Sequence, residues 1–310
     1  MSTLLWTAPA PGPLWHEVQR SLPGFTLLKR ETWQADDLLP NDDVETWICN
    51  PSAQFTIGDK HLALFPALRL LVTPSTGANH VDKAALERRG IAFRSLLDDR
   101  DALEAISASA EHTFLLLLAA FRNLMDGVGL VAEGEWHDER FVRGNELQGK
   151  TVGLVGYGRI GRRLERWLAA FGASTLKTDP YTVQNSMRLD DLFTDCDAVV
   201  VCCAYTPETP GMVTGDHLRR MKKRAVLVNT ARGEVFDEQS VLDALEERGD
   251  LRVAVDVLPG EAQDAMRVKD WYDTGALITP HMAGTTIESQ TKAAKIACKL
   301  AKRYWKREAE

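Results

Sequence analysis

A chain of 310 residues is long enough for two domains, each with its own buried core. Its content of 45% hydrophobic and 26% charged residues is typical of a soluble globular protein. The net charge of −7 argues against a general nucleic-acid-binding surface, which would need a strongly basic face.

The cysteines, the amino terminus and the apolar runs indicate a cytoplasmic protein without membrane contact. The five cysteines are odd in number and lack the CxxC spacing of zinc sites, so we expect them to be reduced. Residues 1–15 lack a basic segment and contain early prolines, unlike a signal peptide. The longest apolar run, residues 114–121, is far below the roughly 20 residues that a membrane-spanning helix needs.

The first hundred residues alternate short apolar runs with amphipathic stretches. Strands are expected at 46–49, 68–72 and 91–93. A helix is expected over 81–89, and Gly90 should end it. This order of strand and helix predicts a parallel sheet covered by helices.

Residues 102–125 are expected to form one helix with a leucine-rich centre buried on nearly all sides, and Asp126-Gly127 should end it. The polar stretch 134–148 should be a loop, ahead of a strand at 151–155. An amphipathic helix should follow and end at Gly172. Its apolar face is formed by Ile160, Leu164, Trp167, Leu168 and Phe171.

The second half repeats the alternation of strand and helix. One helix is expected over 237–248 with Asp237 as its N-cap, and a last helix over 288–305. Strands are expected at 198–202, 225–229, 253–257 and 277–279.

A glycine motif with the spacing GxGxxG follows the strand at 151–155. The glycines permit a tight turn and let the backbone approach a pyrophosphate, which the start of the next helix stabilises. The spacing alone is a weak signal, but the preceding strand and the following amphipathic helix disfavour a turn that serves only packing. We therefore expect a dinucleotide site, formed by Gly156, Tyr157, Gly158, Arg159, Ile160 and Gly161.

An acidic residue in the right place favours NAD as the cofactor. Asp179 lies 18 residues after Gly161, near the end of the next expected strand. Its carboxylate would accept hydrogen bonds from the adenosine ribose and repel the 2′-phosphate of NADP. Lys177 nearby instead favours NADP, because an ammonium group attracts phosphate.

Three residues with catalytic chemistry follow later strands. Arg232 could hold a carboxylate by two hydrogen bonds. His281 could exchange a proton near neutral pH, and Glu261 could orient its ring and stabilise the imidazolium. A loop arginine or a single histidine is more often structural, so the hypothesis depends on their placement at strand ends. The other histidines lack a comparable setting and metal-ligand spacing, and we expect no metal: His16, His61, His80, His112, His137 and His217.

Together, these motifs resemble the D-isomer-specific 2-hydroxyacid dehydrogenase family, from about Leu68 to the carboxyl terminus. Residues 110–113 are similar to the family's interdomain helix, and residues 75–82 to its substrate loop. The resemblance implies that Arg232 clamps the substrate, that His281 is the acid/base and that Glu261 is its partner.

The resemblance also implies binding residues. The backbone amides of Thr76 and Gly77 would hold the substrate carboxylate, and Asp256 would contact the nicotinamide carboxamide. Besides the glycine motif and Asp179, the implied NAD contacts are Thr206, Thr230, Ala231, Asp256, His281 and Gly284.

The implied architecture is α/β, with two doubly wound domains. A flavodoxin-like substrate domain would comprise residues 1–100 and 284–310, and a Rossmann cofactor domain would comprise residues 101–283. The cleft between them would close on a small-molecule ligand, and the family usually forms homodimers through the cofactor domain. Departures from the family pattern leave the substrate open: Asn79, Ala204, Arg224 and Ala262.

The implied function is hydride transfer between NAD(H) and a small D-2-hydroxyacid or its 2-keto acid. Formate dehydrogenases of this superfamily lack the Glu–His pair, so Glu261 and His281 argue against formate as substrate. Phosphite dehydrogenases keep the pair and are an alternative. A second alternative is a nucleotide-sensing binding protein, like the transcriptional corepressors that share the fold.

Overall fold

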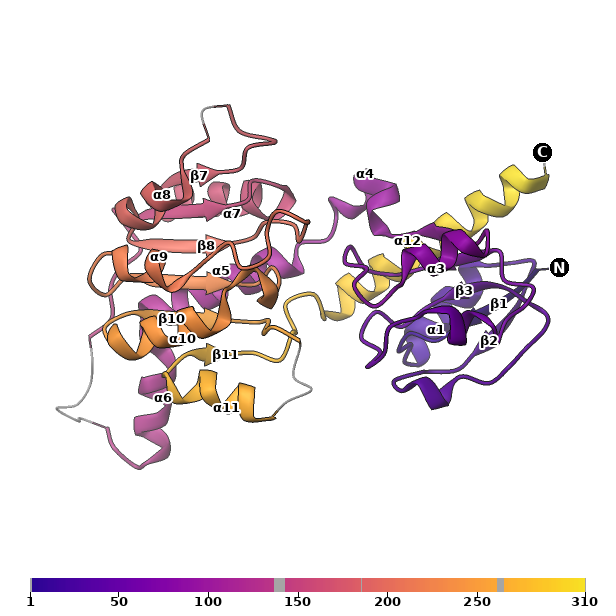
Figure 1. The fold of residues 1–310 in the computed structure, drawn as a ribbon, viewed down its shortest axis with the longest axis horizontal. Helices are drawn as coiled ribbons and strands as arrows, with labels where there is room; N and C mark the ends of the chain where they lie inside the picture. The colour runs from indigo at the N-terminus through magenta and orange to yellow at the C-terminus, as the bar shows by residue number, and fades with distance from the viewer. Residues whose placement is uncertain (1, 137–142, 185, 261–264, 310) are drawn as a thin grey trace. The chain divides into compact units, whose positions relative to one another are not determined.

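The computed structural model describes residues 2–136, 143–184, 186–260 and 265–309. The chain divides into two compact units. Unit 1 consists of Met1–Ile106 and Ile287–Glu310, and unit 2 of Ser107–Thr286 (Figure 1).

Unit 1 contains a five-stranded parallel sheet of order β2-β1-β3-β4-β5, which is a flavodoxin-like order. Helices α1 (Gly12–Ser21) and α12 (Ile287–Ala309) cover one face of the sheet, and α2 (Asp59–Leu62) and α3 (Lys83–Arg88) cover the other. The strands are β1 (Ser2–Trp6), β2 (Phe25–Lys29), β3 (Val44–Ile48), β4 (Leu70–Val72) and β5 (Ala92–Arg94). The shorter elements are η1 (Ala35–Asp37), η2 (Leu96–Asp99) and α4 (Arg100–Leu103).

Unit 2 contains a six-stranded parallel sheet of order β11-β10-β9-β8-β6-β7. Its strands are β6 (Thr151–Val155), β7 (Ser174–Thr178), β8 (Ala198–Val201), β9 (Val226–Asn229), β10 (Arg252–Val255) and β11 (Leu277–Ile278). Four of them, β6 and β8 to β10, are almost wholly buried, which is typical of a parallel sheet with helices on both faces.

Two sets of helices cover the sheet of unit 2 (Figure 1). Helices α5 (Ala108–Phe121) and α7 (Arg159–Ala170) pack on one face. The other face carries α8 (Leu189–Asp195), α9 (Gly215–Arg220), α10 (Glu238–Glu247) and α11 (Ala265–Asp273). The remaining helices are α6 (Leu124–Ala132) and η3 (Gly233–Val235). The predicted α/β class with two doubly wound sheets is confirmed.

The prediction of one helix over 102–125 is wrong. The segment contains α4, α5 and the start of α6, and α5 ends because Asn123 adopts a left-handed conformation with φ of 47°. Asparagine tolerates this conformation better than most residues. Helix α6 then runs through Asp126-Gly127, where an end was predicted, and Leu115 in the leucine-rich centre is 54% exposed.

Two predicted helix boundaries are confirmed, one expected burial is wrong, and two strands, β1 and β2, were missed. Gly172 ends α7 with a φ of +73°, as predicted, but Phe171 is exposed and packs edge-on against Phe114. Asp237 caps α10 by accepting a hydrogen bond from the amide of Ser240, as predicted. The amino-terminal segment was assigned no structure from its sequence, yet it forms β1 between β2 and β3.

Among the described residues, no single helix has the length and apolar character to cross a membrane. One pair of helical segments, Leu96–Leu103 and Ala108–Phe121, passes that test only when joined across a bend of 75°.

Candidate nucleotide and catalytic site

The parallel topology of unit 2 brings most of the candidate residues to one edge of its sheet. The glycine motif follows β6, Arg232 follows β9, Asp256 follows β10 and His281 follows β11. Strand order reverses between β6 and β8, and ligands of doubly wound folds bind at the carboxyl ends of strands beside such a reversal.

The glycine turn is held by close backbone packing. Gly156 has a φ of +94°, and a side chain there would place its Cβ 2.5 Å from Cα of Cys203. A Cβ on Gly161 would lie 2.6 Å from the carbonyl oxygen of Gly156, which also accepts a hydrogen bond from the Cys202 thiol at 3.0 Å. These two glycines therefore let the turn pack against the β8 loop and against α7.

Gly158 has a different environment, and it provides a test of whether the turn fits a pyrophosphate. It is the N-cap of α7, and a Cβ built on it would meet no atom within 4 Å. Packing does not require glycine here, so the open space in front of the helix start matches the space that a phosphate group needs. The residues present thus fit a dinucleotide.

Asp179 follows β7 and is tied to the glycine turn. Its Oδ2 accepts the backbone amide of Tyr157 at 2.7 Å, and its Oδ1 accepts the amides of Tyr181 and Thr182 at 3.0 and 3.1 Å. Burial acts to raise the pKa of Asp179, but the hydrogen bonds, led by that of Tyr157, outweigh it and leave the pKa lowered. Asp179 is therefore an ionised acceptor beside the turn.

The nearby Lys177 forms an ion pair within unit 2. Its ammonium group pairs with the carboxylate of Glu165 on α7 and lies 4.5 Å from the ring centroid of Tyr157. The hydroxyl of Tyr157 also donates a hydrogen bond to Glu165. The Glu165 hydrogen bond raises the pKa of Lys177, so the ammonium stays protonated and its charge is balanced by the Glu165 carboxylate. This cluster was not predicted from the sequence.

The loop that carries Arg232 is built by a buried asparagine at the end of β9. The Asn229 amide nitrogen donates to the carbonyl of Arg232 at 3.0 Å, and its amide oxygen accepts the amide of Ala231 at 3.0 Å. The Thr230 hydroxyl lies 2.6 Å from the hydroxyl of Thr113 on α5. The guanidinium of Arg232 donates to the carbonyl of Ala231 and is half-buried.

Gly233 fixes this loop against the loop after β10. A Cβ on Gly233 would lie 2.0 Å from the carbonyl carbon of Leu258, so only glycine permits this approach. The amide of Gly260 donates to Glu234 at 3.2 Å. The predicted partner Glu261 comes next in the chain and lies outside the described residues.

Asp256 holds the turn that carries His281. Its side chain is buried, and it accepts the amides of Met282 and Ala283 at 2.9 Å each. Its backbone carbonyl accepts the amide of His281 at 2.9 Å, and His281 has a φ of 48°. A non-glycine residue in this region is strained, which is common at functional sites.

His112, for which the sequence predicted no role, reaches the same carboxylate. Its Nε2 lies 3.0 Å from the hydroxyl of Thr279 and 3.4 Å from Oδ1 of Asp256. The Thr279 hydroxyl in turn lies 2.6 Å from that Oδ1. The sequence pattern indicates that His112 lies in a helix, but it cannot show that this helix meets the loop after β11.

The other candidate residues lie in loops of their own. Thr206 follows β8, and its amide donates to the Thr209 hydroxyl at 2.9 Å. Thr76 and Gly77 follow β4 in unit 1, where the Ser75 hydroxyl donates to the carbonyl of Gly77 at 2.7 Å. Gly284 in unit 2 lies near Ser109, whose hydroxyl would be 3.8 Å from a Cβ on that glycine.

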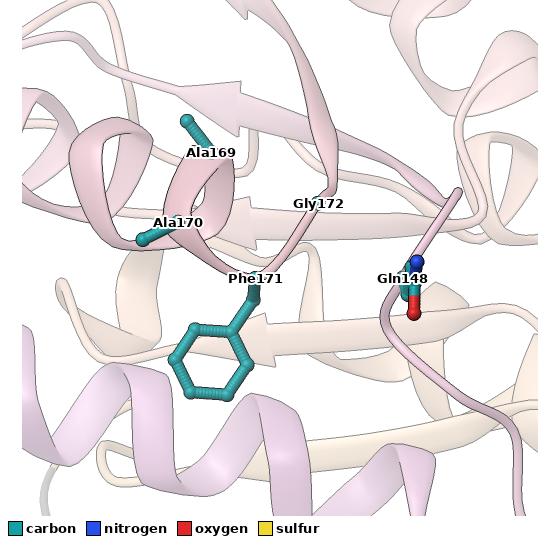
Figure 2. A pocket seen from close by; sticks show the side chains of 5 residues that line it. All are labelled: Gln148, Ala169, Ala170, Phe171 and Gly172. Carbon is teal, nitrogen blue, oxygen red and sulfur yellow. The ribbon is translucent and has the colours of Figure 1, made fainter.

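Two further observations bear on other kinds of site. Within the described ranges, no group of three or more His, Cys, Asp or Glu residues is arranged to hold a metal ion. A surface hollow of about 380 Å³ lies at the carboxyl end of α7, away from the glycine turn at its start (Figure 2). Its lining carries no charged group and consists of Gln148, Ala169, Ala170, Phe171 and Gly172.

The fold and the glycine turn define unit 2 as a dinucleotide-binding domain of the doubly wound class. Residues 114–283 match the family model of the D-isomer specific 2-hydroxyacid dehydrogenase, NAD binding domain. The chain belongs to this family, and its cofactor is NAD.

Three relatives illustrate the range of the family. Formate dehydrogenase of Arabidopsis thaliana is 30% identical over 78% of this chain, which spans only 64% of that protein. Glyoxylate reductase of Thermofilum pendens is 33% identical over 76% of this chain and 71% of its own length. The crystal structure of NAD-dependent formate dehydrogenase from Staphylococcus aureus in complex with NAD matches with a TM-score of 0.81 and 25% identity, covering 99% of this chain and 96% of that chain.

Proposed function

We propose that the protein is an NAD-dependent D-2-hydroxyacid dehydrogenase that interconverts a small D-2-hydroxyacid and its 2-keto acid. The observation that carries this proposal is the meeting, at one edge of a parallel sheet, of a phosphate-fitting turn, an arginine and a histidine. The strained backbone at His281 adds support, because such strain persists where a side chain must point in one direction.

The cofactor half of the site is assigned to unit 2. The turn of Gly156, Tyr157, Gly158, Arg159, Ile160 and Gly161 would hold the pyrophosphate, and Asp179 would bind the adenosine ribose. Thr206, Thr230, Ala231 and Gly284 would line the rest of the dinucleotide. One oxygen of Asp256 would accept a hydrogen bond from the carboxamide of the nicotinamide ring.

The catalytic half is assigned to Arg232, His281 and Glu261. The bound cofactor would supply a hydride to substrate C2 as NADH, or accept one from C2 as NAD⁺. The planar fork of Arg232 would hold the substrate carboxylate by two hydrogen bonds and orient the adjacent carbonyl. His281 would give a proton to the carbonyl oxygen in reduction and take it from the hydroxyl in oxidation. Glu261 would orient the ring of His281.

The second domain is assigned to the substrate. We propose that unit 1 binds the substrate, with the amides of Thr76 and Gly77 directed at its carboxylate. Backbone amides are suited to this role, because they donate without adding a mobile side chain. The hydrogen bond from Ser75 to the carbonyl of Gly77 would keep this loop in place.

We further propose a homodimer through unit 2. Helix α6 has no buried residue, and four of its apolar side chains are about half exposed: Leu124, Met125, Val128 and Val131. Such a patch commonly marks an interface, and a second copy would cover it. The mass in solution should be twice 34.4 kDa, and Val128→Glu should reduce it to one chain. A monomeric unmodified protein would contradict the dimer.

Formate is the second candidate substrate, because the Arabidopsis relative is a formate dehydrogenase. Its oxidation to carbon dioxide transfers a hydride but moves no hydroxyl proton, so it gives His281 no task. Phosphite oxidation and nucleotide sensing without turnover are two more candidate functions, and each predicts a distinct pattern of activity.

One panel of assays separates these functions. NADH oxidation is measured with glyoxylate, pyruvate, hydroxypyruvate and phenylpyruvate, and NAD reduction with formate and phosphite. We expect turnover of at least one 2-keto acid at sub-millimolar KM and none of formate or phosphite. Turnover of formate or phosphite alone would reassign the substrate. Tight NADH binding without any turnover would favour a sensing role.

A further inference from the structure

Asp256 is the point at which the turn of His281 is fixed to the sheet. Its carboxylate accepts the amides of Met282 and Ala283, and its backbone carbonyl accepts the amide of His281. The backbone of residues 281–283 is therefore held by Asp256, and this backbone sets the direction of the His281 side chain. Any group that sets the orientation of the Asp256 carboxylate also sets the direction of His281.

The Thr279 hydroxyl makes a short contact to that carboxylate, 2.6 Å to Oδ1. An ionised carboxylate has no proton to give, so the single proton of the hydroxyl is donated to Asp256. The length is typical of a strong O–H···O⁻ hydrogen bond.

This assignment also determines which atom donates in the contact between His112 and Thr279. Because the proton of the Thr279 hydroxyl is engaged with Asp256, its oxygen can only accept at the 3.0 Å contact with His112. Nε2 of His112 must therefore carry a proton and donate it. The same nitrogen lies 3.4 Å from Oδ1 of Asp256, and the His112 side chain is only 12% exposed.

We propose that His112 is a positioning residue for His281, acting through Thr279 and Asp256. Its Nε2–H holds the Thr279 hydroxyl in the direction that donates to Oδ1 of Asp256. Oδ1 thus accepts from Thr279 and Met282, whereas Oδ2 accepts from Ala283 and has capacity for a second donor. The proposal rests on the function assigned above to His281 and Asp256.

The position of the network in the chain fits this role. Helix α5 begins at Ala108, just after the chain enters unit 2, and residues 279–283 lie just before it leaves at Thr286. His112 thus fastens the start of α5 to the turn near the exit. A histidine that only filled space would not need to place its Nε2–H against the Thr279 hydroxyl.

Matched variants separate donation from packing. His112→Gln keeps a nitrogen donor at the reach of Nε2, whereas His112→Met has a similar length without a donor. Thr279→Ser keeps the hydroxyl, whereas Thr279→Val keeps the shape without it. Each is compared for kcat and KM with the best 2-keto acid, for the NADH dissociation constant, for melting temperature, and for amide hydrogen exchange of residues 281–283.

We expect His112→Met and Thr279→Val to lower kcat by about 10-fold or more, since a small misplacement of a reacting group has effects of this order. The keto-acid KM should change by less than about threefold, and the amides of Met282 and Ala283 should exchange faster. The variants His112→Gln and Thr279→Ser should retain most of the kcat and most of the protection of these amides from exchange. The double variant His112→Met/Thr279→Val should lose no more than the worse single variant, because both act on one network.

Two results would overturn the proposal. Equal kcat and equal exchange in His112→Gln and His112→Met would show that only packing matters. Unchanged exchange at residues 281–283 in His112→Met would show that the network does not hold the turn. Amide exchange and NADH affinity do not require turnover. If the unmodified protein reduces no 2-keto acid, the proposed function fails while the exchange data still decide whether His112 positions the turn.

Discussion

The carboxylate of Asp179 accepts the backbone amide of Tyr157 at 2.7 Å, which fixes the acid after β7 to the glycine turn after β6. Asp179 therefore holds the turn, and under the proposed function its charge would also bind the ribose and select against the 2′-phosphate of NADP. Substitutions that keep the acceptor but remove the charge can separate these roles.

Asp179→Asn should narrow the preference for NADH over NADPH by about 10-fold, because it removes the repulsion of a 2′-phosphate. The asparagine oxygen can still accept the amide of Tyr157, but its nitrogen cannot accept the amides of Tyr181 and Thr182, so the melting temperature should fall modestly. Dissociation constants from NADH and NADPH fluorescence provide the measurement. Equal affinity for the two cofactors in the unmodified protein would remove Asp179 as the selective residue.

Gly158→Ala should fold normally and bind NADH at least about 10-fold more weakly, a cost of about 1.4 kcal/mol. A Cβ at this position meets no protein atom within 4 Å, so it would collide only with the bound pyrophosphate. Gly129→Ala on α6, which also meets nothing within 4 Å, is the matched control and should leave the affinity unchanged. Normal NADH binding by Gly158→Ala would place the pyrophosphate elsewhere.

Glu165→Gln should improve NADPH binding by a few-fold while leaving NADH binding unchanged. The substitution removes the negative charge that pairs with Lys177 and frees the ammonium to approach a 2′-phosphate. In the double variant Glu165→Gln/Lys177→Met, the gain should disappear. A gain that persists in the double variant would exclude Lys177 as its cause.

Asp250 should stabilise unit 2 at neutral pH and lose this effect in acid. The hydrogen bond from Arg248 is the main cause that lowers its pKa from 3.8 to about 2, and the same guanidinium donates to carbonyls at the end of α9. A lowered carboxyl pKa stabilises the fold above the unfolded pKa, and the effect is lost as the pH falls toward the folded pKa. Asp250→Asn should therefore cost about 1–2 kcal/mol at pH 7.

The measurement is urea unfolding of both proteins at pH 7, 5, 4 and 3. The difference in unfolding free energy should be constant at pH 7 and 5 and shrink below about pH 4. A difference that stays constant down to pH 3 would contradict the assignment to the Asp250 carboxylate.

The strands of unit 2 could be predicted because continuous apolar runs such as those of β8 and β9 are typical of buried parallel strands. Because each run is followed by a polar motif, the sequence also placed Arg232, Asp256 and His281 at strand ends. The glycine motif added the boundary between strand and helix, since its spacing determines where the turn ends and α7 begins.

What the sequence could not show are contacts between elements far apart in the chain. The network of His112, Thr279 and Asp256 joins α5 to loops more than 140 residues later, and no local pattern encodes such a meeting. The break at Asn123 was missed because apolar residues continue on both sides of it, and a left-handed residue leaves no mark in hydrophobic periodicity. Strand β1 was missed because the nearby prolines dominated the pattern of the amino terminus.

The most direct test of the proposed mechanism is the turnover of Arg232→Ala with the 2-keto acid that the unmodified protein reduces best. We predict that kcat/KM falls by at least about 100-fold, because the substrate carboxylate loses its bidentate partner, while the NADH dissociation constant changes by less than about twofold. With a 2-keto acid other than glyoxylate, whose reduced product is achiral, the product of the unmodified protein should be the D enantiomer by chiral chromatography. Near-normal kcat/KM in Arg232→Ala, or an L product, would contradict the mechanism.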